Sequence, residues 1–326
     1  MPAESENPAA ERSLTEGDIS RLRQQHYNAQ AVSIRLVHEA LMILRVRPDG
    51  PKPEFCPGQY SVLGLGYWEP RVADAQSETL KPGQISTLAK RAYSISCRLV
   101  DAQGQLCSAK DDPELEFYIA LIRRAKARPP ALTPRLFLLS EGDRLFLSPD
   151  VHGRCPLERV QPDDALVFMS TGTGEAPHDA MIAECLRHEH RGRIICVTSV
   201  RWKRDLGYLS AHRKVEQQFK NYQYVPLTTR EAENLDPSHP HYVGKRHLQD
   251  FVESGEFQRQ TGCPLIPEET HVFLCGAPEM IGVPHHTHDP EKRYPRPKGM
   301  VEVLEHRGFQ IDKPHEPGNL HFERYW

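Results

Sequence analysis

The chain has no long hydrophobic run, and no apolar segment approaches the roughly 20 residues needed to span a bilayer. Its first residues, Met1 to Pro8, lack the basic and then apolar pattern of a secretory signal. It also lacks a strong excess of one charge, since the formal net charge of its 326 residues is -3 at pH 7. We therefore expect a soluble cytoplasmic protein with no membrane attachment and no nucleic-acid partner.

The chain also lacks any Cys-x-x-Cys pair, because its eight cysteines are scattered. Local spacing therefore provides neither a zinc site nor an iron–sulfur site. If electrons leave this protein singly, the acceptor centre must belong to another protein. His285, His286 and His288 could hold a metal, but a proline-flanked loop rarely fixes coordination geometry. We expect solvated histidines there, and no metal.

The length favours two domains, since a single core tends to stop growing at about 250–300 residues. Residues 1–27 are rich in Ala, Glu, Arg and Gln, and we expect a mobile arm or a short helix there. Residues 28–160 contain short strands separated by Gly/Pro turns, which is typical of an antiparallel β-barrel. The expected strands are 31–38, 41–46, 59–65, 91–96, 116–122 and 144–147.

Residues 161–326 have a different pattern, in which short apolar runs alternate with helical periodicity such as that of 180–186. This βαβ alternation predicts a Rossmann-like parallel sheet with helices on both faces. The boundary is expected near residues 160–164. The segments that fit neither pattern are 67–90, 236–241 and 284–298. The expected strands are 165–169, 193–197, 222–227 and 271–275.

The strand 91–96 opens with Arg91-Ala92-Tyr93-Ser94. Because a strand alternates its faces, Arg91 and Tyr93 point to one side and Ala92 and Ser94 to the other. A guanidinium beside a phenol suits a ligand that joins a phosphate to a planar ring. Taken alone, these four residues favour an ordinary barrel strand over a ligand site.

Two further motifs follow apolar strands. Gly172-Thr173-Gly174 leads directly into a helical segment, and its glycines permit a sharp turn that lets backbone N–H groups approach a pyrophosphate. Cys275-Gly276 ends a later strand, at the sheet edge where ligands bind in such folds. The chain ends with an aromatic pair at 325 and 326.

With these motifs in this order, residues 28–326 resemble the ferredoxin–NADP(H) reductase family in its bacterial form. The resemblance implies a FAD-binding barrel at 28–160 and an NADP(H)-binding α/β domain at 161–326. It implies an enzyme that transfers electrons between NADPH and a separate carrier, ferredoxin or flavodoxin. Two alternatives stay open: a reductase component of an oxygenase system, and a flavin- or nucleotide-binding sensor without turnover.

For FAD, the resemblance implies contacts from the Arg91 strand and from the turn that contains Thr133 and Arg135. We expect Thr133 to cap a helix whose first residue is Pro134, so that the helix N-terminus binds an anion. The implied FAD residues are Arg91, Ala92, Tyr93, Ser94, Tyr118, Thr133, Arg135 and Trp326.

For NADP(H), the resemblance implies the glycine turn and a set of basic residues at the 2′-phosphate, where an acidic residue would favour NAD instead. Whether Lys245 or Arg246 meets the phosphate is left open. The implied NADP residues are Gly172, Thr173, Gly174, Arg201, Arg230, Lys245, Arg246 and Gly276.

The implied reaction centre contains Ser94, Cys275, Glu323 and Trp326. Cys275 would lie against the nicotinamide next to Ser94, with Glu323 nearby, and Trp326 would cover the flavin ring. These are orienting residues, since hydride transfer needs alignment more than acid–base chemistry.

A set of basic residues could steer an acidic electron carrier to the protein, or could belong to an ordinary solvated loop. Its members are Arg123, Arg124, Lys126, Arg128 and Arg135.

Overall fold

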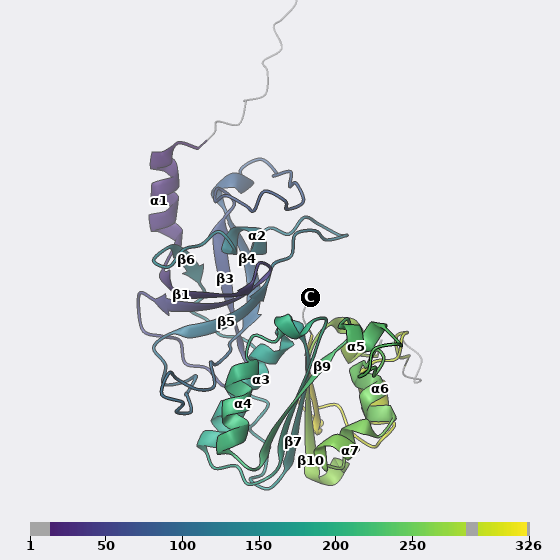
Figure 1. Cartoon of the computed structure of the whole chain (residues 1–326). Coiled ribbons are helices and arrows are strands. Elements are labelled where there is room, and N and C mark those ends of the chain that lie inside the picture. The colour runs from purple at the N-terminus through teal and green to yellow at the C-terminus, as the bar shows by residue number, and fades with distance from the viewer. Residues whose placement is uncertain (1–13, 285–292, 325–326) are drawn as a thin grey trace, which may run out of the picture.

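The computed structural model describes residues 14–284 and 293–324. These residues form two domains, each built around one β-sheet, and Figure 1 shows the first domain above the second. The first sheet is antiparallel, with its six strands in the order β4-β3-β6-β1-β2-β5. All six expected strands are present. They are β1 (Ala29–His38), β2 (Leu41–Pro48), β3 (Tyr60–Gly66), β4 (Leu88–Ser94), β5 (Leu115–Ala120) and β6 (Arg144–Leu147).

The two ends of this sheet curl towards one another into a barrel. Just beyond β4, the Ser96 N–H donates to the Glu116 carbonyl of β5 over 2.8 Å, so the edge strands meet through an isolated antiparallel bridge. Inside, Leu44, Leu63 and Phe117 are fully buried. The alternating apolar pattern of these strands is therefore used to fill one interior.

The second sheet is parallel, with its five strands in the order β11-β10-β7-β8-β9. The four expected strands are present, together with a last strand close to the chain end that pairs with β10. They are β7 (Ala165–Thr171), β8 (Ile194–Val200), β9 (Tyr222–Thr228), β10 (Thr270–Gly276) and β11 (Leu320–Arg324).

Helices cover both faces of the parallel sheet, as Figure 1 shows for α3 and α4 on one side and α5 to α7 on the other. Side chains alternate accordingly: Phe168 packs on the α3 and α4 side, and Val167 on the opposite side. Burial on both faces explains why these strands read as nearly continuous apolar runs. The helices are α3 (Glu175–Arg187), α4 (Leu209–Gln218), α5 (Ala232–Leu235), α6 (Leu248–Glu253), α7 (Glu256–Thr261), α8 (Pro278–Ile281) and α9 (Met300–Glu305).

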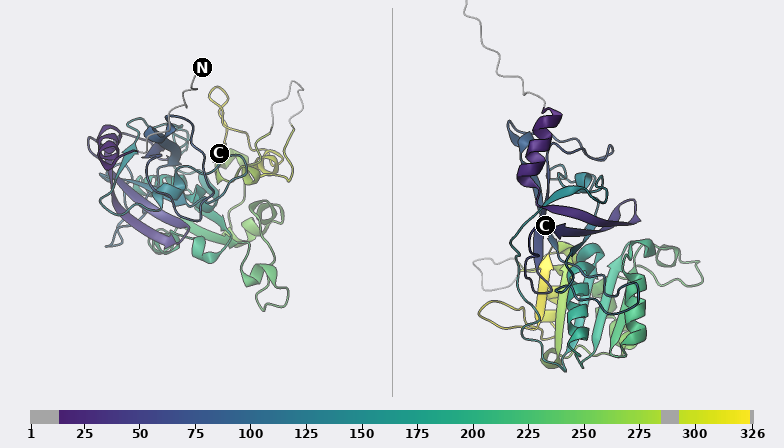
Figure 2. Two further views of the ribbon diagram at one scale, coloured as in Figure 1. Left: turned by 90° about the horizontal axis from the view of Figure 1, so that it is seen from above. Right: turned by 90° about the vertical axis from the view of Figure 1, so that its left-hand side faces the viewer.

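Helix α1 (Glu16–His26) extends away from the barrel, as the second view of Figure 2 shows most clearly. It begins with a capping box between Thr15 and Asp18 and buries none of its residues. It is attached near its end, where Arg23 pairs with Glu69 of the segment 67–90. A short helix, one of the two expectations for residues 1–27, is therefore present in the described part of that extension.

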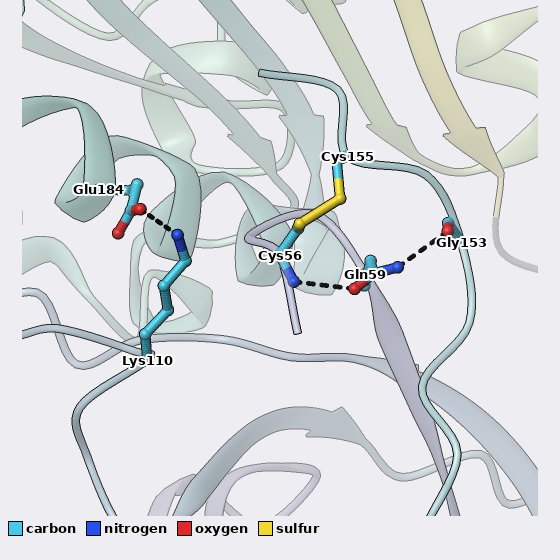
Figure 3. Close-up of a disulfide and its surroundings, with 6 residues drawn as sticks. All are labelled: Cys56, Gln59, Lys110, Gly153, Cys155 and Glu184. Atoms are coloured by element: carbon cyan, nitrogen blue, oxygen red, sulfur yellow. Dashed lines mark hydrogen bonds and ion pairs between the residues drawn. A yellow bond between two sulfur atoms is a disulfide. The ribbon is translucent and has the colours of Figure 1, made fainter. Parts of the chain in front are cut away.

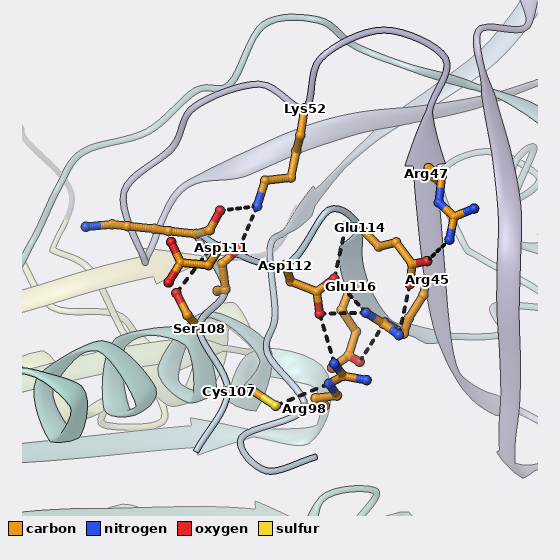
Figure 4. Close-up of polar contacts among 12 residues, drawn as sticks. Arg45, Arg47, Lys52, Arg98, Cys107, Ser108, Asp111, Asp112, Glu114 and Glu116 are labelled. Carbon is orange, nitrogen blue, oxygen red and sulfur yellow. Dashed lines mark hydrogen bonds and ion pairs between the residues drawn. The ribbon is translucent and has the colours of Figure 1, made fainter. Parts of the chain in front are cut away.

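A hydrogen-bonded seam joins the barrel to the parallel sheet. The Tyr208 hydroxyl donates to Glu116 over 2.8 Å and lies 3.0 Å from the Ser96 hydroxyl. On the barrel side Glu116 lies 3.9 Å from Arg45, whose guanidinium is also paired with Asp112, as Figure 4 shows. The charges beside the seam are thus compensated within the barrel, and Tyr208 links them to α4.

A disulfide ties the β2–β3 loop to the connection between β6 and β7, as drawn in Figure 3. Cys56 and Cys155 are joined with their Cα atoms 5.4 Å apart. Next to them the Gln59 side-chain amide donates to the Gly153 carbonyl over 3.0 Å. The connection, residues 148–164, contains the expected domain boundary. The sequence did not predict this bond, because its partners are 99 residues apart.

Within residues 14–284 and 293–324, no helix is both long enough and apolar enough to cross a membrane. The cytoplasmic location stays a prediction. The Cys56–Cys155 disulfide weighs against it, since disulfides are rare in reducing compartments.

Removing this disulfide should lower the free energy of unfolding by about 2–5 kcal/mol, because the bond closes a long loop in the unfolded chain. Urea unfolding of wild type and of the double variant Cys56→Ser/Cys155→Ser measures the difference. Dithiothreitol should destabilise the wild type in the same way and leave the double variant unchanged. Equal stability of wild type and variant without reductant would show that the bond does not form in solution.

Candidate functional site

Three of the predicted reaction-centre residues meet where the barrel touches the parallel sheet. Ser94 is the last residue of β4, and its hydroxyl donates to Glu323 Oε2 over 3.2 Å. Cys275, near the end of β10, lies opposite Glu323 in the parallel pairing of β10 with β11. The carboxyl end of one sheet and the end of a barrel strand therefore present a hydroxyl, a thiol and a carboxyl together.

The Glu323 carboxyl has an unusual acidity. Burial raises its pKa from the usual 4.5 to about 7, and the hydrogen bond from Ser94 opposes this shift only in part. A carboxyl that titrates near neutrality can hold or release a proton at the seam under physiological conditions.

The glycine turn packs directly against the end of β10. A Cβ on Gly174 would lie 2.3 Å from the Cys275 carbonyl oxygen, so only glycine permits this approach. Gly276 has a φ of +134°, and a Cβ there would lie 2.2 Å from Thr171 Oγ1. The Thr171 hydroxyl oxygen in turn accepts from the Ala277 N–H over 2.8 Å. The turn after β7 and the end of β10 thus form one close-packed backbone surface.

A cavity of about 370 Å³ opens beside this surface, between the β6–β7 connection and the parallel sheet. Cys275 and Glu323 form part of its wall, and His178 of α3 contributes a fully buried ring. Burial lowers the pKa of His178 to about 3, so its imidazole stays neutral, and Nδ1 has no hydrogen-bond partner among the described residues. Arg154 and Arg159, which pair with Asp312, also line the cavity.

On the neighbouring barrel strand, Arg91 is exposed and Tyr93 is partly covered. The Tyr93 hydroxyl is buried and has no hydrogen-bond partner among the described residues. Burial raises the pKa of this phenol, so the hydroxyl stays protonated and available as a donor. Because β4 is an edge strand of the sheet, a ligand can lie along it without displacing another strand.

Tyr118 of β5 has its hydroxyl partners in the second domain, and its FAD contact stays a prediction. Its hydroxyl donates to the Asp205 carbonyl over 2.8 Å and accepts from the Gly207 N–H over 2.9 Å. The ring stands edge-on to Tyr208, 5.1 Å between centroids. Tyr118 is therefore occupied as a contact of the seam.

The predicted capped turn is wrong in its details. Helix α2 (Thr133–Leu136) begins at Thr133, so this residue is not the cap, and the helix has no side-chain cap. The Thr133 hydroxyl oxygen instead accepts from the Ile122 N–H over 3.1 Å. A helix of four residues also provides little of the dipole on which the predicted anion site relied.

Arg135 is turned inward and is only 3% exposed. Its guanidinium pairs with Glu78 and donates to the Tyr67 carbonyl, which binds the segment 67–90 to α2. The expectation that Arg135 faces an approaching carrier is therefore wrong. In contrast, Arg124, Lys126 and Arg128 are exposed.

The basic corner that was predicted for a 2′-phosphate forms beyond β8 and β9. The Arg230 N–H donates to the Arg201 carbonyl over 2.9 Å, which places the two residues side by side, and both are exposed. Lys245 is exposed as well, whereas the Arg246 guanidinium pairs with Glu256. Which of these two residues meets a 2′-phosphate stays open.

Trp326 and Tyr325 lie outside the described residues, as do His285, His286 and His288. Sequence reasoning also missed several residues around the cavity. These are His178, Arg154, Arg159 and Asp312, and they come from segments whose spacing gave no sign that they meet.

Comparisons with known proteins agree with this geometry. A family model described as an oxidoreductase NAD-binding domain matches residues 168–285. The chain is 26% identical over 243 residues to the flavodoxin/ferredoxin–NADP reductase of Escherichia coli, covering 74% of this chain and 82% of that protein. It is 29% identical over 200 residues to the ferredoxin–NADP reductase of Pseudomonas aeruginosa, covering 59% and 68%. The chain is thus similar in sequence to the ferredoxin–NADP reductases of these two bacteria.

A solved structure gives the same result for the fold. The ferredoxin NADP+ reductase of Neisseria gonorrhoeae, with bound FAD and NADP, matches with a TM-score of 0.67 at 18% identity. The match covers 91% of this chain and 97% of that one. The resemblance read from the motifs, and the barrel-plus-parallel-sheet architecture that it implied, are confirmed.

The acidity of Glu323 makes stability depend on pH. With a pKa of 4.5 unfolded and about 7 folded, the folded protein binds more protons between these values. Protonation of Glu323 therefore contributes to the stability of the folded protein. This contribution to the free energy of unfolding is fully present below pH 4.5 and is lost as pH rises through 7. Glu323→Gln should remove this pH dependence. As the pH rises from 4.5 to 7, the free energy of unfolding of the variant should therefore increase by roughly 2 kcal/mol relative to that of wild type. This value is reduced to allow for the partial exposure of Glu323.

Urea unfolding at a series of pH values measures this difference. Glu279→Gln, which alters an exposed carboxyl just beyond β10, is the matched control and should follow the wild-type profile. Parallel profiles for Glu323→Gln and wild type would contradict the raised pKa.

Proposed function

We propose that this protein is a FAD-dependent ferredoxin– or flavodoxin–NADP(H) reductase that transfers electrons between NADPH and a separate one-electron carrier. The observation that carries the proposal is the meeting of Ser94, Cys275 and Glu323 at the seam. A hydride donor and its acceptor must be aligned at close range, and this is the point where the two expected cofactor surfaces converge. FAD supplies the conversion between hydride transfer and single-electron transfer.

The barrel residues fit FAD. The Tyr93 hydroxyl is an orphaned buried donor, which a polar group of a bound flavin would satisfy. Arg91 lies on the same side of the strand and suits a phosphate. Ser94, the next residue along the strand after Tyr93, would position the flavin ring beside Glu323.

The second domain fits NADP(H). Gly172 has a φ of +54° and open space where a Cβ would be, so the turn leaves its backbone accessible at the N-terminus of α3. Arg201 and Arg230 would bind the 2′-phosphate, together with Lys245. Arg246 is less suited because Glu256 already pairs with it.

The electron carrier should dock near the exposed cations that follow β5. Arg124, Lys126 and Arg128 are exposed there, and an acidic carrier would be steered to them at low ionic strength. Ferredoxin and flavodoxin are the carriers named for the relatives of this chain.

Anaerobic titration of the purified flavoprotein with NADPH tests the proposal. The flavin absorbance should bleach, and oxidised ferredoxin or flavodoxin should restore it. A yellow protein that NADPH does not bleach would instead be a sensor. Bleaching without reoxidation by either carrier would point to the reductase component of an oxygenase system.

Loss of a charge-assisted phosphate contact should cost roughly 1.5–3 kcal/mol, or about ten- to a hundredfold in affinity. Arg201→Ala and Arg230→Ala should therefore raise KM for NADPH by that factor and leave KM for NADH nearly unchanged. Arg259→Ala, an exposed arginine on α7, is the control. Equal losses with both nucleotides would remove these residues from the 2′-phosphate site.

Arg91→Ala should weaken FAD binding by about ten- to a hundredfold for the same reason, and Tyr93→Phe by a smaller factor. Flavin content after dialysis and fluorescence titration of the apoprotein measure both effects. The control is Lys90→Ala, since Lys90 lies on the other face of the strand with its ammonium 3.9 Å from the Phe146 ring. Full flavin affinity in Arg91→Ala would remove Arg91 from the site.

A further inference from the structure

A cluster of ionisable side chains lies inside the second domain, apart from the cavity described above. We call it the α3–α4 cluster and define it as Glu175, Asp179, Cys196 and His212. Glu175 and Asp179 lie one turn apart on α3, Cys196 is on β8, and His212 is on α4. All four residues are 0% exposed. Such a group is seldom buried without a specific partner.

The distances within this cluster are those of ligands around one ion. His212 Nε2 lies 3.0 Å from Glu175 Oε1 and 3.2 Å from Asp179 Oδ1. Ligand atoms of Glu175, Cys196 and His212 all lie within 4.8 Å of one another. A tetrahedral zinc with bonds of about 2.0–2.2 Å to nitrogen and oxygen has ligand atoms roughly 3.3–3.5 Å apart. An ion therefore fits between the imidazole and the carboxylates after only small shifts.

The carboxyl oxygens of the cluster leave positions that a cation would fill. The two carboxyl groups of Glu175 and Asp179 share one imidazole, that of His212. Among the described residues no lysine or arginine pairs with either carboxylate, and Glu175 Oε2 and Asp179 Oδ2 have no hydrogen-bond partner. A buried carboxylate oxygen without a partner is costly, and a divalent cation would satisfy both.

The surrounding hydroxyls hold these side chains in place. The Tyr222 hydroxyl lies 2.7 Å from His212 Nδ1, which leaves Nε2 directed at the carboxylates. The hydroxyls of Thr198 and Tyr224 donate to Glu175 Oε1 over 2.9 and 2.7 Å. These bonds fix Glu175 Oε1, which also faces His212, and leave Oε2 as the oxygen available to an ion. Hydrogen bonds that hold ligand side chains in place are usual in protein metal sites.

We propose that the α3–α4 cluster binds one structural divalent cation, with zinc favoured by its mixed nitrogen, sulfur and oxygen donors. Glu175, Cys196 and His212 supply the three ligand atoms that lie within 4.8 Å of one another, and Asp179, whose Oδ1 is 3.2 Å from His212 Nε2, is the proposed fourth ligand. The site is closed, so the ion has no open position for a substrate. Binding releases the thiol proton of Cys196. The lack of a Cys-x-x-Cys pair does not exclude this site, because its ligands come from three separate elements.

The ion has a defined structural role. Glu175 is the first residue of α3 and directly follows the Gly172–Gly174 turn. Coordination therefore fixes the start of α3 against β8 and α4, and holds the turn in its observed position. The inference stands on the cluster alone and does not depend on the proposed reductase activity.

The test is the zinc content of untagged protein, purified without chelator and measured by inductively coupled plasma mass spectrometry. Wild type should hold a single zinc ion per chain. Cys196→Ser and His212→Gln should lose most of it. Cys185→Ser, which changes another buried cysteine on α3 outside the cluster, is the matched control and should retain it.

A second measurement keeps the test decisive if a variant fails to fold. Wild type stripped with a chelator should melt at a lower temperature and recover with added Zn²⁺. Substituted Co²⁺ should give tetrahedral visible bands and a thiolate charge-transfer band, the latter absent in Cys196→Ser. Metal-free wild type that takes up neither ion would overturn the proposal, and so would uptake that the cluster variants leave unchanged. Bleaching by NADPH is scored separately, so failure of the metal site is distinguishable from failure of the proposed function.

Discussion

The contact on which the proposed site depends is the hydrogen bond between Ser94 and Glu323, because it joins the end of a barrel strand to a strand of the parallel sheet. It sets the surface expected to hold a flavin beside Cys275 at the end of β10. Without that alignment, Arg91 and Tyr93 would belong to an ordinary barrel edge and the glycine turn to an ordinary α/β domain. The proposed function therefore depends on the contact between the barrel and the parallel sheet.

The seam is held in one orientation by buried polar groups that lie away from the reaction centre. Tyr118 and Tyr208 cross it from opposite sides, and their hydroxyls find partners only when the two domains are docked as observed. Losing such a partner inside the protein costs about 1–3 kcal/mol for each group left unpaired. The disulfide restrains the connection between the domains, and the proposed ion would fix the start of α3.

Much of the fold could be predicted from the sequence, since alternating and continuous apolar runs depend only on nearby residues. Ten of the eleven strands in the two sheets were expected from such runs, and the exception is the last strand, β11. The errors concern contacts between distant segments. Arg135 was expected on the surface, but it is buried and paired with Glu78. No sequence pattern indicated that the Tyr118 hydroxyl bonds to the backbone of the second domain. Neither the Cys56–Cys155 bond nor the α3–α4 cluster could be predicted from a local sequence pattern, because their residues come from separate segments of the chain.

The most direct test of the central claim is anaerobic stopped-flow measurement of flavin reduction by NADPH carrying deuterium at the transferred position of nicotinamide C4. If the seam aligns the two cofactors for hydride transfer, the deuterium should slow reduction, and Ser94→Ala should slow it further while FAD remains bound. An unchanged rate in Ser94→Ala, or no reduction by NADPH in the wild type, would contradict the account.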